Sequence, residues 1–447
     1  MGDSANSSRS KTVVIGAGSA GLACATKLVD LGRDVTVVEA SPFVGGLARS
    51  LELWGQIVDL GPHRFFSHDR VVINFWSRFV GSEFTRVNRL TRIAYQGTFF
   101  LYPLDAADAL RKLSPIDTAH ALASYAKARA RPIAEPRSFE DWVTNRFGGH
   151  LFRMFFKTYS EKVWGISCQE LDADWAAQRI KKLSLFEAAK AAVFKDRGRT
   201  HKTLADEFKY PRGGSGVIYE RMRQHIEAKG GSVRLSAPVK RVLVENGRAK
   251  GVELESGEVR TADHVVVATT AGRAAALLPG DWRDERAFLE GIVTPPFVFP
   301  TFFLDRPLEK GVWSWVSQMG KGGRVSIMID ALRKSPLTVT SGKSVLLAWP
   351  CYPASADLVG LSDDEVVDAC RRELDEYFPG FSSWIEETHV TRHAHAVPFH
   401  PVGHQGRALR FLAQTDRRGV SFAGDYLSGG YLEPALWSAE RAAAIHG

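Results

Sequence analysis

Three glycines and one acidic residue near the N-terminus have the types and spacing of a dinucleotide-binding site. Gly16, Gly18 and Gly21 follow the apolar run Val13–Ile15, and Glu39 ends a second apolar run eighteen residues after Gly21. In a GxGxxG motif the first glycine allows a tight turn, the second lets a pyrophosphate approach the backbone, and the third lets the helix pack against the strand. The residues expected to contact the dinucleotide are Gly16, Gly18, Ser19, Ala20, Gly21, Glu39 and Ala40.

Glycines also serve ordinary turns, so a triplet alone is weak evidence. Here the strand before the motif, the helical pattern after it and the acid at the end of the second strand are all present. The helix N-terminus supplies N–H groups and a positive dipole end for a phosphate. The Glu39 carboxylate can accept hydrogen bonds from both ribose hydroxyls and would repel a 2′-phosphate. We therefore predict a dinucleotide whose adenosine has no 2′-phosphate.

Composition narrows the class of protein. The 447 residues exceed what one core usually supports, which predicts two domains. The four cysteines lie far apart without metal-ligand spacing, which favours a reducing compartment. A net charge of +8 without a basic run argues against nucleic-acid binding. No apolar run reaches the roughly 18 to 20 residues of a transmembrane helix. We predict a cytoplasmic protein with a disordered tail at residues 1–10.

Two further segments have the features of a flavin site. Gly45 and Gly46 open a loop in which the backbone and the Arg49 guanidinium could meet a second phosphate or a flavin edge. Near the C-terminus, 419–425 reads as a strand and turn, and 431–435 opens a helix whose N-terminus can stabilise negative charge on a flavin.

Together with the first motif, these segments resemble the flavin-binding signature of the amine oxidase and protoporphyrinogen oxidase superfamily. The resemblance implies FAD, and no cysteine lies near the C-terminal motif where some monoamine oxidases attach it, so we expect noncovalent FAD. In the monoamine oxidases the tyrosine that matches Tyr431 faces the flavin. The further cofactor contacts that the resemblance implies are Gly46, Leu47, Ala48, Arg49, Val239, Gly424, Asp425, Leu432 and Ala435.

Part of the chain also resembles the UDP-galactopyranose mutases. The segment Gly61-Pro62-His63 matches one that lies beside the isoalloxazine ring in that family, although a hydrogen-bonded loop histidine is the alternative for His63. The stretch 155–180 is similar to the mutase substrate domain, where arginines hold a diphosphate. Arg179 matches the first of these arginines, whereas only Lys181 or Lys182 stands near the second.

Five histidines fall between His389 and His404. His393 and His395 alternate on an expected strand without an acid or cysteine, and we predict no metal site there. The stretch 392–404 resembles the protoporphyrinogen oxidase segment that leads to the last flavin motif, which implies that His404 lies close to the cofactor. We predict that His63, His404 and Tyr431 line one pocket over the flavin, with a histidine as the proton acceptor and Tyr431 positioning the substrate.

The remaining patterns predict an α/β protein with a Rossmann-type FAD-binding domain and a discontinuous mixed α+β substrate-binding domain. The first domain is expected at residues 11–62, 205–283 and 388–447, and the second at 63–204 and 284–387. The elements expected within them are a hairpin at 92–102, helices at 106–112, 119–130, 139–147 and 217–228, a β-meander at 232–235, 239–244 and 251–254, and a buried strand at 264–269.

Three classes of function compete. We favour an FAD-dependent oxidoreductase (an oxidase, dehydrogenase or desaturase) that moves a hydride from a small-molecule substrate, such as an amine, a sugar or a secondary metabolite, to flavin N5, with molecular oxygen or another electron acceptor reoxidising the flavin. The amine oxidases usually carry a lysine bridged by water to flavin N5, and 294–304 contains none, which weighs against lysine-assisted chemistry. The alternatives are a redox-neutral nucleotide-sugar mutase and a non-catalytic binding module like the prenyl-protein escort factors. The intact Gly424-Asp425 pair argues against the last.

Overall fold

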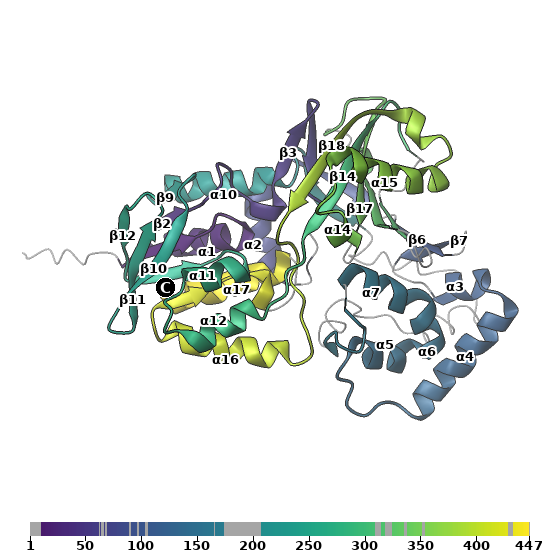
Figure 1. Cartoon of the computed structure of the whole chain (residues 1–447), viewed down its shortest axis with the longest axis horizontal. Helices are drawn as coiled ribbons and strands as arrows, with labels where there is room; N and C mark the ends of the chain where they lie inside the picture. Colours follow the sequence, from purple (N-terminus) through teal and green to yellow (C-terminus); the bar gives the residue numbers. More distant parts are fainter. Residues whose placement is uncertain are drawn as a thin grey trace, which may run out of the picture.

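The computed structural model describes residues 10–61, 63, 67, 69–88, 91–95, 98–102, 106–164, 166–173, 207–308, 314–317, 324–334, 338–350, 354–427 and 432–446. In these residues the chain forms a parallel sheet covered by helices, a larger mixed sheet and a helical lobe (Figure 1). The two sheets lie side by side in separate halves of the molecule, and the chain passes between them several times.

The parallel sheet has five strands, and every neighbouring pair in it is parallel. In spatial order the strands are β19 (Val420–Phe422), β13 (His264–Val267), β1 (Lys11–Ile15), β2 (Asp34–Val38) and β9 (Ser232–Arg234). Along β1, Val14 belongs to one apolar core, whereas Val13 and Ile15 belong to another. Because successive strand residues point to opposite faces, the sheet is buried on both sides, as parallel sheets require.

Helices cover one face of this sheet, and helices with a small antiparallel sheet cover the other. The first layer consists of α1 (Ser19–Asp30), α2 (Arg70–Val80), α10 (Gly216–Ala228) and α17 (Leu432–His446). The second consists of β10 (Val239–Glu245), β11 (Arg248–Leu254), β12 (Val259–Thr261), α11 (Ala271–Leu277), α12 (Arg283–Glu290) and α16 (His404–Asp416).

Strand β9 corrects the predicted meander. The antiparallel sheet contains only β10, β11 and β12, whereas β9 pairs in parallel with β2, with Ser232 opposite Thr36. A parallel pair needs a crossover connection, and α10 precedes β9 directly. The sequence of β9 cannot show this, because a three-residue strand carries no information about the direction of its partner.

The larger sheet has seven strands and is antiparallel except where β15 runs parallel to β6. In order the strands are β18 (Ile385–His393), β14 (Phe297–Leu304), β17 (Ser344–Pro350), β16 (Val325–Asp330), β15 (Ser314–Ser317), β6 (Thr91–Tyr95) and β7 (Thr98–Tyr102). The predicted hairpin is confirmed, since Tyr95 lies opposite Thr98. The short helices α13 (Ala331–Lys334) and α14 (Ala354–Asp357) and the longer α15 (Asp363–Tyr377) accompany this sheet.

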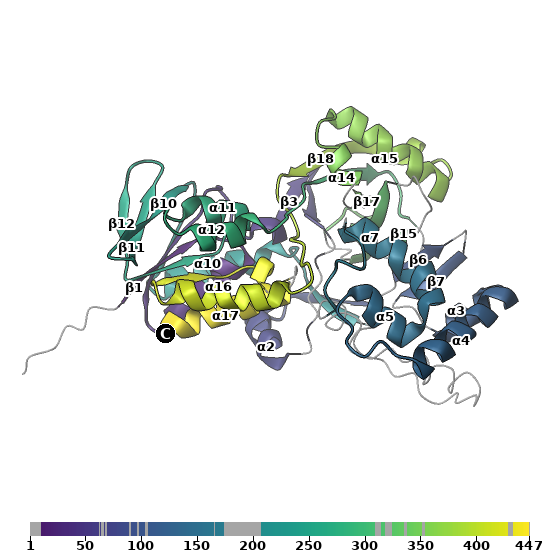
Figure 2. The ribbon, with the colours of Figure 1, turned by 60° about the horizontal axis from the view of Figure 1, so that its bottom comes forward.

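The helical lobe lies below the large sheet and has its own apolar core (Figures 1 and 2). Its helices are α3 (Ala106–Lys112), α4 (Pro115–Ala130), α5 (Phe139–Phe147), α6 (Gly149–Leu151), the π-helical segment η2 (Phe152–Lys157) and α7 (Thr158–Trp164). Helix α4 begins four residues earlier than predicted. Ser114 caps it by accepting from the Asp117 N–H, and Pro115 occupies its first position, where no N–H is needed.

Three elements pack against a different part of the chain from the one that the predicted domain boundaries assign them to. Helix α2 packs in the core of α1, and Leu289 of α12 packs in the core of β13, whereas β18 pairs with β14 along its length. We propose that α2 and α12 belong to the flavin-binding half and that β18 belongs to the substrate half. Among the described residues, no helix is long and apolar enough to cross a membrane.

A buried carboxylate joins the segments that run between the two halves. These are β3 (Ser50–Leu53), β4 (Gln56–Asp59), β5 (Phe84–Asn88) and β8 (Glu207–Pro211). The Asp59 carboxylate is 5% exposed and accepts from Ser50 Oγ at 2.6 Å, Tyr210 Oη at 2.8 Å and the Ser215 N–H at 3.0 Å. Ser215 Oγ also donates to it. Four donors therefore hold one carboxylate at the point where β4 leads into the Gly61 loop.

This hydrogen-bond network predicts that replacing Asp59 lowers the stability much more than replacing Tyr210. Asp59→Ala should lower the free energy of unfolding by about 3 to 5 kcal/mol, because several buried donors lose their acceptor at once. Tyr210→Phe removes one donor and should cost about 1 kcal/mol. Thermal and urea unfolding of both variants measure this, and equal small losses would contradict the role of Asp59.

Candidate functional site

The glycines of the first motif have different steric surroundings. Gly16 has a φ of +103°, and a Cβ on it would lie 2.4 Å from Ala268 O. A Cβ on Gly21 would lie 1.9 Å from Gly16 O, so the start of α1 packs directly on the end of β1. Among the residues that the structure describes, none has an atom within 4 Å of the place where a Cβ on Gly18 would stand. The fold therefore requires two of the glycines, and the space over the third is open to a ligand.

The loop of Gly45 and Gly46 packs against the first glycine motif. Gly45 N–H donates to Ala17 O at 2.8 Å, and Gly18 and Gly45 form an isolated parallel bridge. The short helix η1 (Gly46–Ala48) follows, and the Arg49 guanidinium lies 5.0 Å from the centre of the Phe43 ring. The Gly16–Gly21 segment and the Gly45–Gly46 loop, which are separate motifs in the sequence, are thus in direct contact beside the N-terminus of α1.

Glu39 follows β2 and holds the backbone around the glycine loop. One carboxylate oxygen accepts from the Ala17 N–H at 2.7 Å, and the other accepts from the Ser41 N–H at 2.8 Å. Ala237 N–H donates to Glu39 O at 2.8 Å, which brings the start of β10 at Val239 near the same strand end. An ionised carboxylate has about four acceptor positions, so these two bonds leave capacity for ribose hydroxyls.

The C-terminal motif reaches the same edge of the sheet. Gly424 and Asp425 follow β19 directly, and the Gly424 N–H donates to Ser438 Oγ of α17 at 2.9 Å. Asp425 opens the short helix η4 (Asp425–Leu427). The residue keeps some accessible surface, but protein surrounds its carboxyl group, and this burial raises the pKa of Asp425 to about 7. Leu432 begins α17, and Ala435 is buried in the core beneath it.

These segments meet at the carboxyl ends of parallel strands. Gly16 follows β1, Glu39 follows β2 and Asp425 follows β19, and in the sheet β1 lies between β2 and β13, which the chain reaches by different connections. Ligands of open α/β sheets bind at this kind of crevice. The N-terminal N–H groups of α1 have no side-chain cap, and its first turn has no acidic residue, so they can receive a phosphate. The donor set fits a flavin dinucleotide.

The Gly61 loop contacts the large sheet. Gly61 has a φ of +139°, and a Cβ on it would lie 3.5 Å from the Trp349 ring and 3.9 Å from His63 Nε2. Trp349, at the end of β17, packs on Phe297 with ring centres 4.7 Å apart. The loop therefore joins the flavin-binding half to one face of the substrate sheet, while Pro62 lies outside the described residues.

Within the described part of the chain, the buried ring nitrogens Trp349 Nε1 and His393 Nε2 have no hydrogen-bond partner. His393 lies opposite Phe297 in the sheet, and burial and the positive charge of Arg49 lower its pKa. Sequence analysis did not select Trp349, and it considered His393 only as a metal ligand. The two lie on β17 and β18, and only strand pairing places these strands on either side of β14. In the sequence, the only pattern that could have indicated these two residues is the alternation of inward and outward side chains along their strands.

His404 is held in the core of the flavin-binding half. It is 4% exposed, and its Nε2 lies 2.7 Å from Tyr426 O, so Nε2 carries the proton and donates. Its ring stacks on Phe288 at 5.9 Å and meets His400 edge to face at 4.4 Å. Burial lowers the pKa of His404, which keeps the ring neutral. These contacts give His404 a structural role, and its part in catalysis stays a prediction.

Two predicted substrate residues, Arg179 and Tyr431, lie outside the described residues. The pocket of His63, His404 and Tyr431 and the diphosphate contact of Arg179 therefore stay predictions. Within the described part of the chain, no three His, Cys, Asp or Glu side chains are grouped so that they could hold a metal ion.

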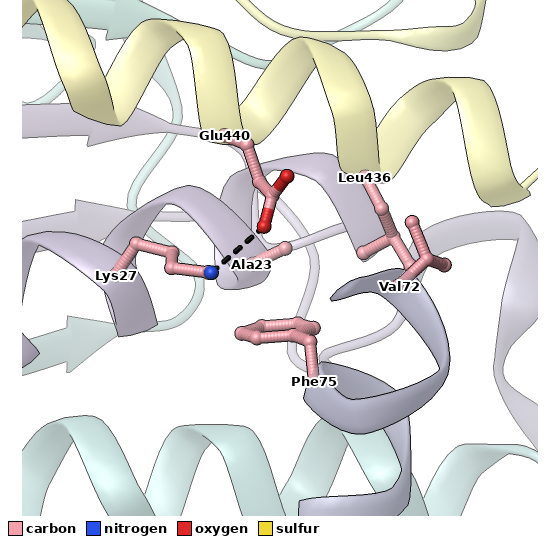
Figure 3. A pocket seen from close by; sticks show the side chains of 6 residues that line it. All are labelled: Ala23, Lys27, Val72, Phe75, Leu436 and Glu440. Carbon is pink, nitrogen blue, oxygen red and sulfur yellow. Dashed lines mark hydrogen bonds and ion pairs between the residues drawn. The ribbon is translucent and has the colours of Figure 1, made fainter. Parts of the chain in front are cut away.

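A surface hollow between α1, α2 and α17 is not a substrate site. Figure 3 shows Lys27 Nζ paired with Glu440 Oε1 at 2.7 Å across it, with the Phe75 ring beneath. Lys27 lies in the last turn of α1, whereas the phosphate-binding end of that helix is its first turn. The hollow therefore lies at the wrong end of α1 to meet the flavin.

Comparison with known proteins agrees with this geometry. A family model described as flavin containing amine oxidoreductase matches residues 19–445. The chain belongs to this family. The assignment confirms the predicted superfamily, the FAD cofactor and the class of FAD-dependent oxidoreductase.

Relatives within and around the family differ in activity. The chain is 23% identical over 454 residues to coproporphyrinogen III oxidase of Bacillus subtilis (strain 168), covering 94% of this chain and 93% of the relative. It is 29% identical over 218 residues to 15-cis-phytoene desaturase of Capsicum annuum, covering 47% of this chain. That match spans only 36% of the desaturase. The solved structure of reduced UDP-galactopyranose mutase has a TM-score of 0.82 at 18% identity, covering 97% of this chain and 94% of that one. This likeness confirms the predicted fold.

The steric surroundings of the glycines predict that one substitution lowers stability and that another lowers FAD affinity without a loss of stability. Gly21→Ala should lower the free energy of unfolding by about 2 kcal/mol or more, since its Cβ would overlap Gly16 O. Gly18→Ala should leave stability within about 0.5 kcal/mol, because the new methyl group enters open space. It should nevertheless weaken FAD binding about ten-fold or more by occupying the phosphate position. FAD titration and unfolding of the apoprotein test both, and unchanged FAD affinity of Gly18→Ala would exclude the phosphate assignment.

The raised pKa of Asp425 predicts that the stability of the apoprotein depends on pH. Its folded pKa of about 7 lies above the ordinary value of 3.8, so between these values the folded protein holds a proton that the unfolded chain has released. Stability therefore falls as pH rises through this window. Asp425→Asn should stabilise the apoprotein by about 2 to 4 kcal/mol above about pH 8 and by little below about pH 4. Melting temperatures across this range measure the effect, and a pH-independent difference between variant and wild type would refute it.

Proposed function

We propose that this protein oxidises a small-molecule substrate by removing a hydride from a substrate carbon, with bound FAD as its cofactor. The observation that carries the proposal is the convergence of Gly16–Gly21, Glu39 and Gly424–Asp425 at one edge of a parallel sheet. Two distant parts of the sequence, one near each end of the chain, thereby supply a phosphate site, a ribose site and a second helix N-terminus. A binding module without flavin would have no use for all three.

The residues of this edge bind and orient the cofactor. The open space at Gly18 and the uncapped start of α1 receive the pyrophosphate, and Glu39 receives the ribose hydroxyls. Asp425 and the N-terminus of α17 bind the polar groups of FAD that the first motif and Glu39 do not contact. When bound, FAD supplies the acceptor for the substrate hydride.

The Gly61 loop and the large sheet supply the substrate side. His63, half-buried beside Gly61, is the residue that we assign as proton acceptor, since an ordinary histidine pKa near 6.5 suits that role at neutral pH. The Trp349 ring and His63 Nε2 both lie within 4 Å of the place where a Cβ of Gly61 would stand, so we assign Trp349 the role of shielding His63 from water. Strand β14 has the sequence FVFPTFFL and contains no lysine, which argues against lysine-assisted oxygen chemistry.

The relatives suggest what the substrate resembles. Coproporphyrinogen III oxidase of Bacillus subtilis matches nearly the whole chain, which favours a large cyclic or conjugated substrate over a small amine. The electron acceptor, the noncovalent attachment of FAD and the cytoplasmic location are further parts of the proposal.

A redox-neutral mutase is the second candidate, because Gly61-Pro62-His63 resembles the mutase segment and the mutase fold covers 97% of this chain. Anaerobic incubation of the FAD-loaded protein with porphyrinogens, polyenes, amines and nucleotide sugars separates the two. Loss of the yellow colour with a substrate supports the oxidoreductase. Turnover of a nucleotide sugar without net loss of colour would replace it by the mutase.

His63 predicts a kinetic effect once a substrate is found. His63→Ala should slow flavin reduction by roughly 10²-fold or more if His63 accepts the proton, and added imidazole should restore part of the rate. His395→Ala is a suitable control, because His395 is exposed and its contact is with Thr294 Oγ1 at 3.2 Å. Anaerobic stopped-flow absorbance measures both. A His63→Ala rate equal to that of wild type would leave orientation alone as the role of this loop.

A further inference from the structure

Helix α4 is firmly attached to the lobe by one side. Ala121 and Ala128 are buried there, and Ser124 Oγ accepts from the His150 N–H at 3.0 Å. A Cβ on Gly148 would lie 2.6 Å from Tyr125 N, so the chain after α5 passes directly against the helix. The orientation of α4 about its own axis is therefore fixed by backbone contacts.

The opposite side of α4 is apolar although it faces solvent. Ile116 is 70% exposed and Leu122 is 47% exposed, and Ile133, just beyond the helix, is 41% exposed. Exposed alanines fill the space between them at helical spacing. We call this surface the α4 face, and it consists of Ile116, Ala119, Leu122, Ala123, Ala126, Ala130 and Ile133.

A solvent-facing helix normally carries charged or polar residues on its outer side. The helix α15, which is similar in length, follows this rule, with Asp, Glu and Arg along its outer side. Helix α4 does not, and an exposed apolar face with such a regular pattern indicates a surface that something covers.

The charged residues of segment 118–134, which carries most of the α4 face, are all basic. Lys127, Arg129 and Arg131 are exposed at its edges, and no acidic residue occurs between Asp117 and Glu135. Asp117 itself lies toward the lobe, where it accepts from Ser114 and pairs with His150 at 3.4 Å. Apolar side chains surrounded by basic ones, without acids, match the surface of an anionic bilayer, where the chains enter the interface and the cations meet lipid phosphates.

The position of the helix fits a flat partner. In both views α3 and α4 form the end of the molecule that lies farthest from the parallel sheet, and α4 is at the outer margin of the lobe (Figures 1 and 2). A second copy is a poorer occupant, because a two-fold interface would place the same cations against each other. We propose that the α4 face binds the surface of an anionic phospholipid membrane.

The test is sedimentation of the full-length, FAD-loaded protein with vesicles. Wild type should bind vesicles of phosphatidylcholine mixed with phosphatidylglycerol, bind pure phosphatidylcholine much less, and be released at high salt. The triple variant Lys127→Gln, Arg129→Gln, Arg131→Gln should lower partitioning on the order of a hundred-fold. A matched triple, Lys229→Gln, Lys250→Gln, Arg417→Gln, removes the same charge from exposed positions of the flavin-binding half and should bind like wild type.

The apolar part of the face has its own pair of variants. Ile116→Ser with Leu122→Ser should lower binding about ten-fold or more, since both side chains would enter the interface. Leu31→Ser with Leu409→Ser is the control, because these leucines are 59% and 60% exposed on the other half of the molecule. FAD content and melting temperature show that each variant is folded.

Three results would overturn the proposal. The first is failure of wild type to bind the anionic vesicles, and the second is equal binding by the α4 variants and their controls. The third is self-association of wild type in analytical ultracentrifugation that Ile116→Ser abolishes, which would assign the α4 face to a second copy.

Discussion

The close approach of β1 and α1 is the constraint on which the cofactor site depends. Gly21 lies so near Gly16 O that any side chain there would overlap it, and Gly16 has a backbone conformation that favours glycine. This contact fixes the first turn of α1 at the end of β1, which leaves its N–H groups uncapped and directed at the open space over Gly18. The Glu39 carboxylate then holds the same loop from the next strand. The proposed phosphate site is thus a consequence of how the helix meets the sheet.

The carboxylates of Asp59 and Asp425, both in the flavin-binding half, have different surroundings. Asp59 receives four donors and stands at the junction, where it stabilises the connection between the halves. Asp425 lies at a strand end where burial raises its pKa to about 7. A carboxyl group that is costly to ionise in the apoprotein gains most from a ligand that donates hydrogen bonds to it. One acid therefore serves the fold, and the other is suited to the cofactor.

Each function of the chain has its own part of the molecule. The parallel sheet presents the dinucleotide site, the large sheet meets it through Gly61 and Trp349, and the helical lobe extends beyond both. Because α4 lies at the far end of that lobe, a membrane contact there would leave the strand ends of the parallel sheet free.

The sequence by itself determined the features that depend on local chemistry. Glycine spacing, the acid after β2, the Gly424-Asp425 turn and the hairpin at β6 and β7 are short-range patterns, so they predicted the Rossmann-type fold and the family. Tertiary structure alone decided the rest. The parallel partner of β9, the core position of His404 and the placement of Trp349 and His393 on the two strands that flank β14 all depend on residues far apart in the chain. The physical reason is that strand pairing and burial are properties of the neighbours in space, which a residue's own sequence context does not contain.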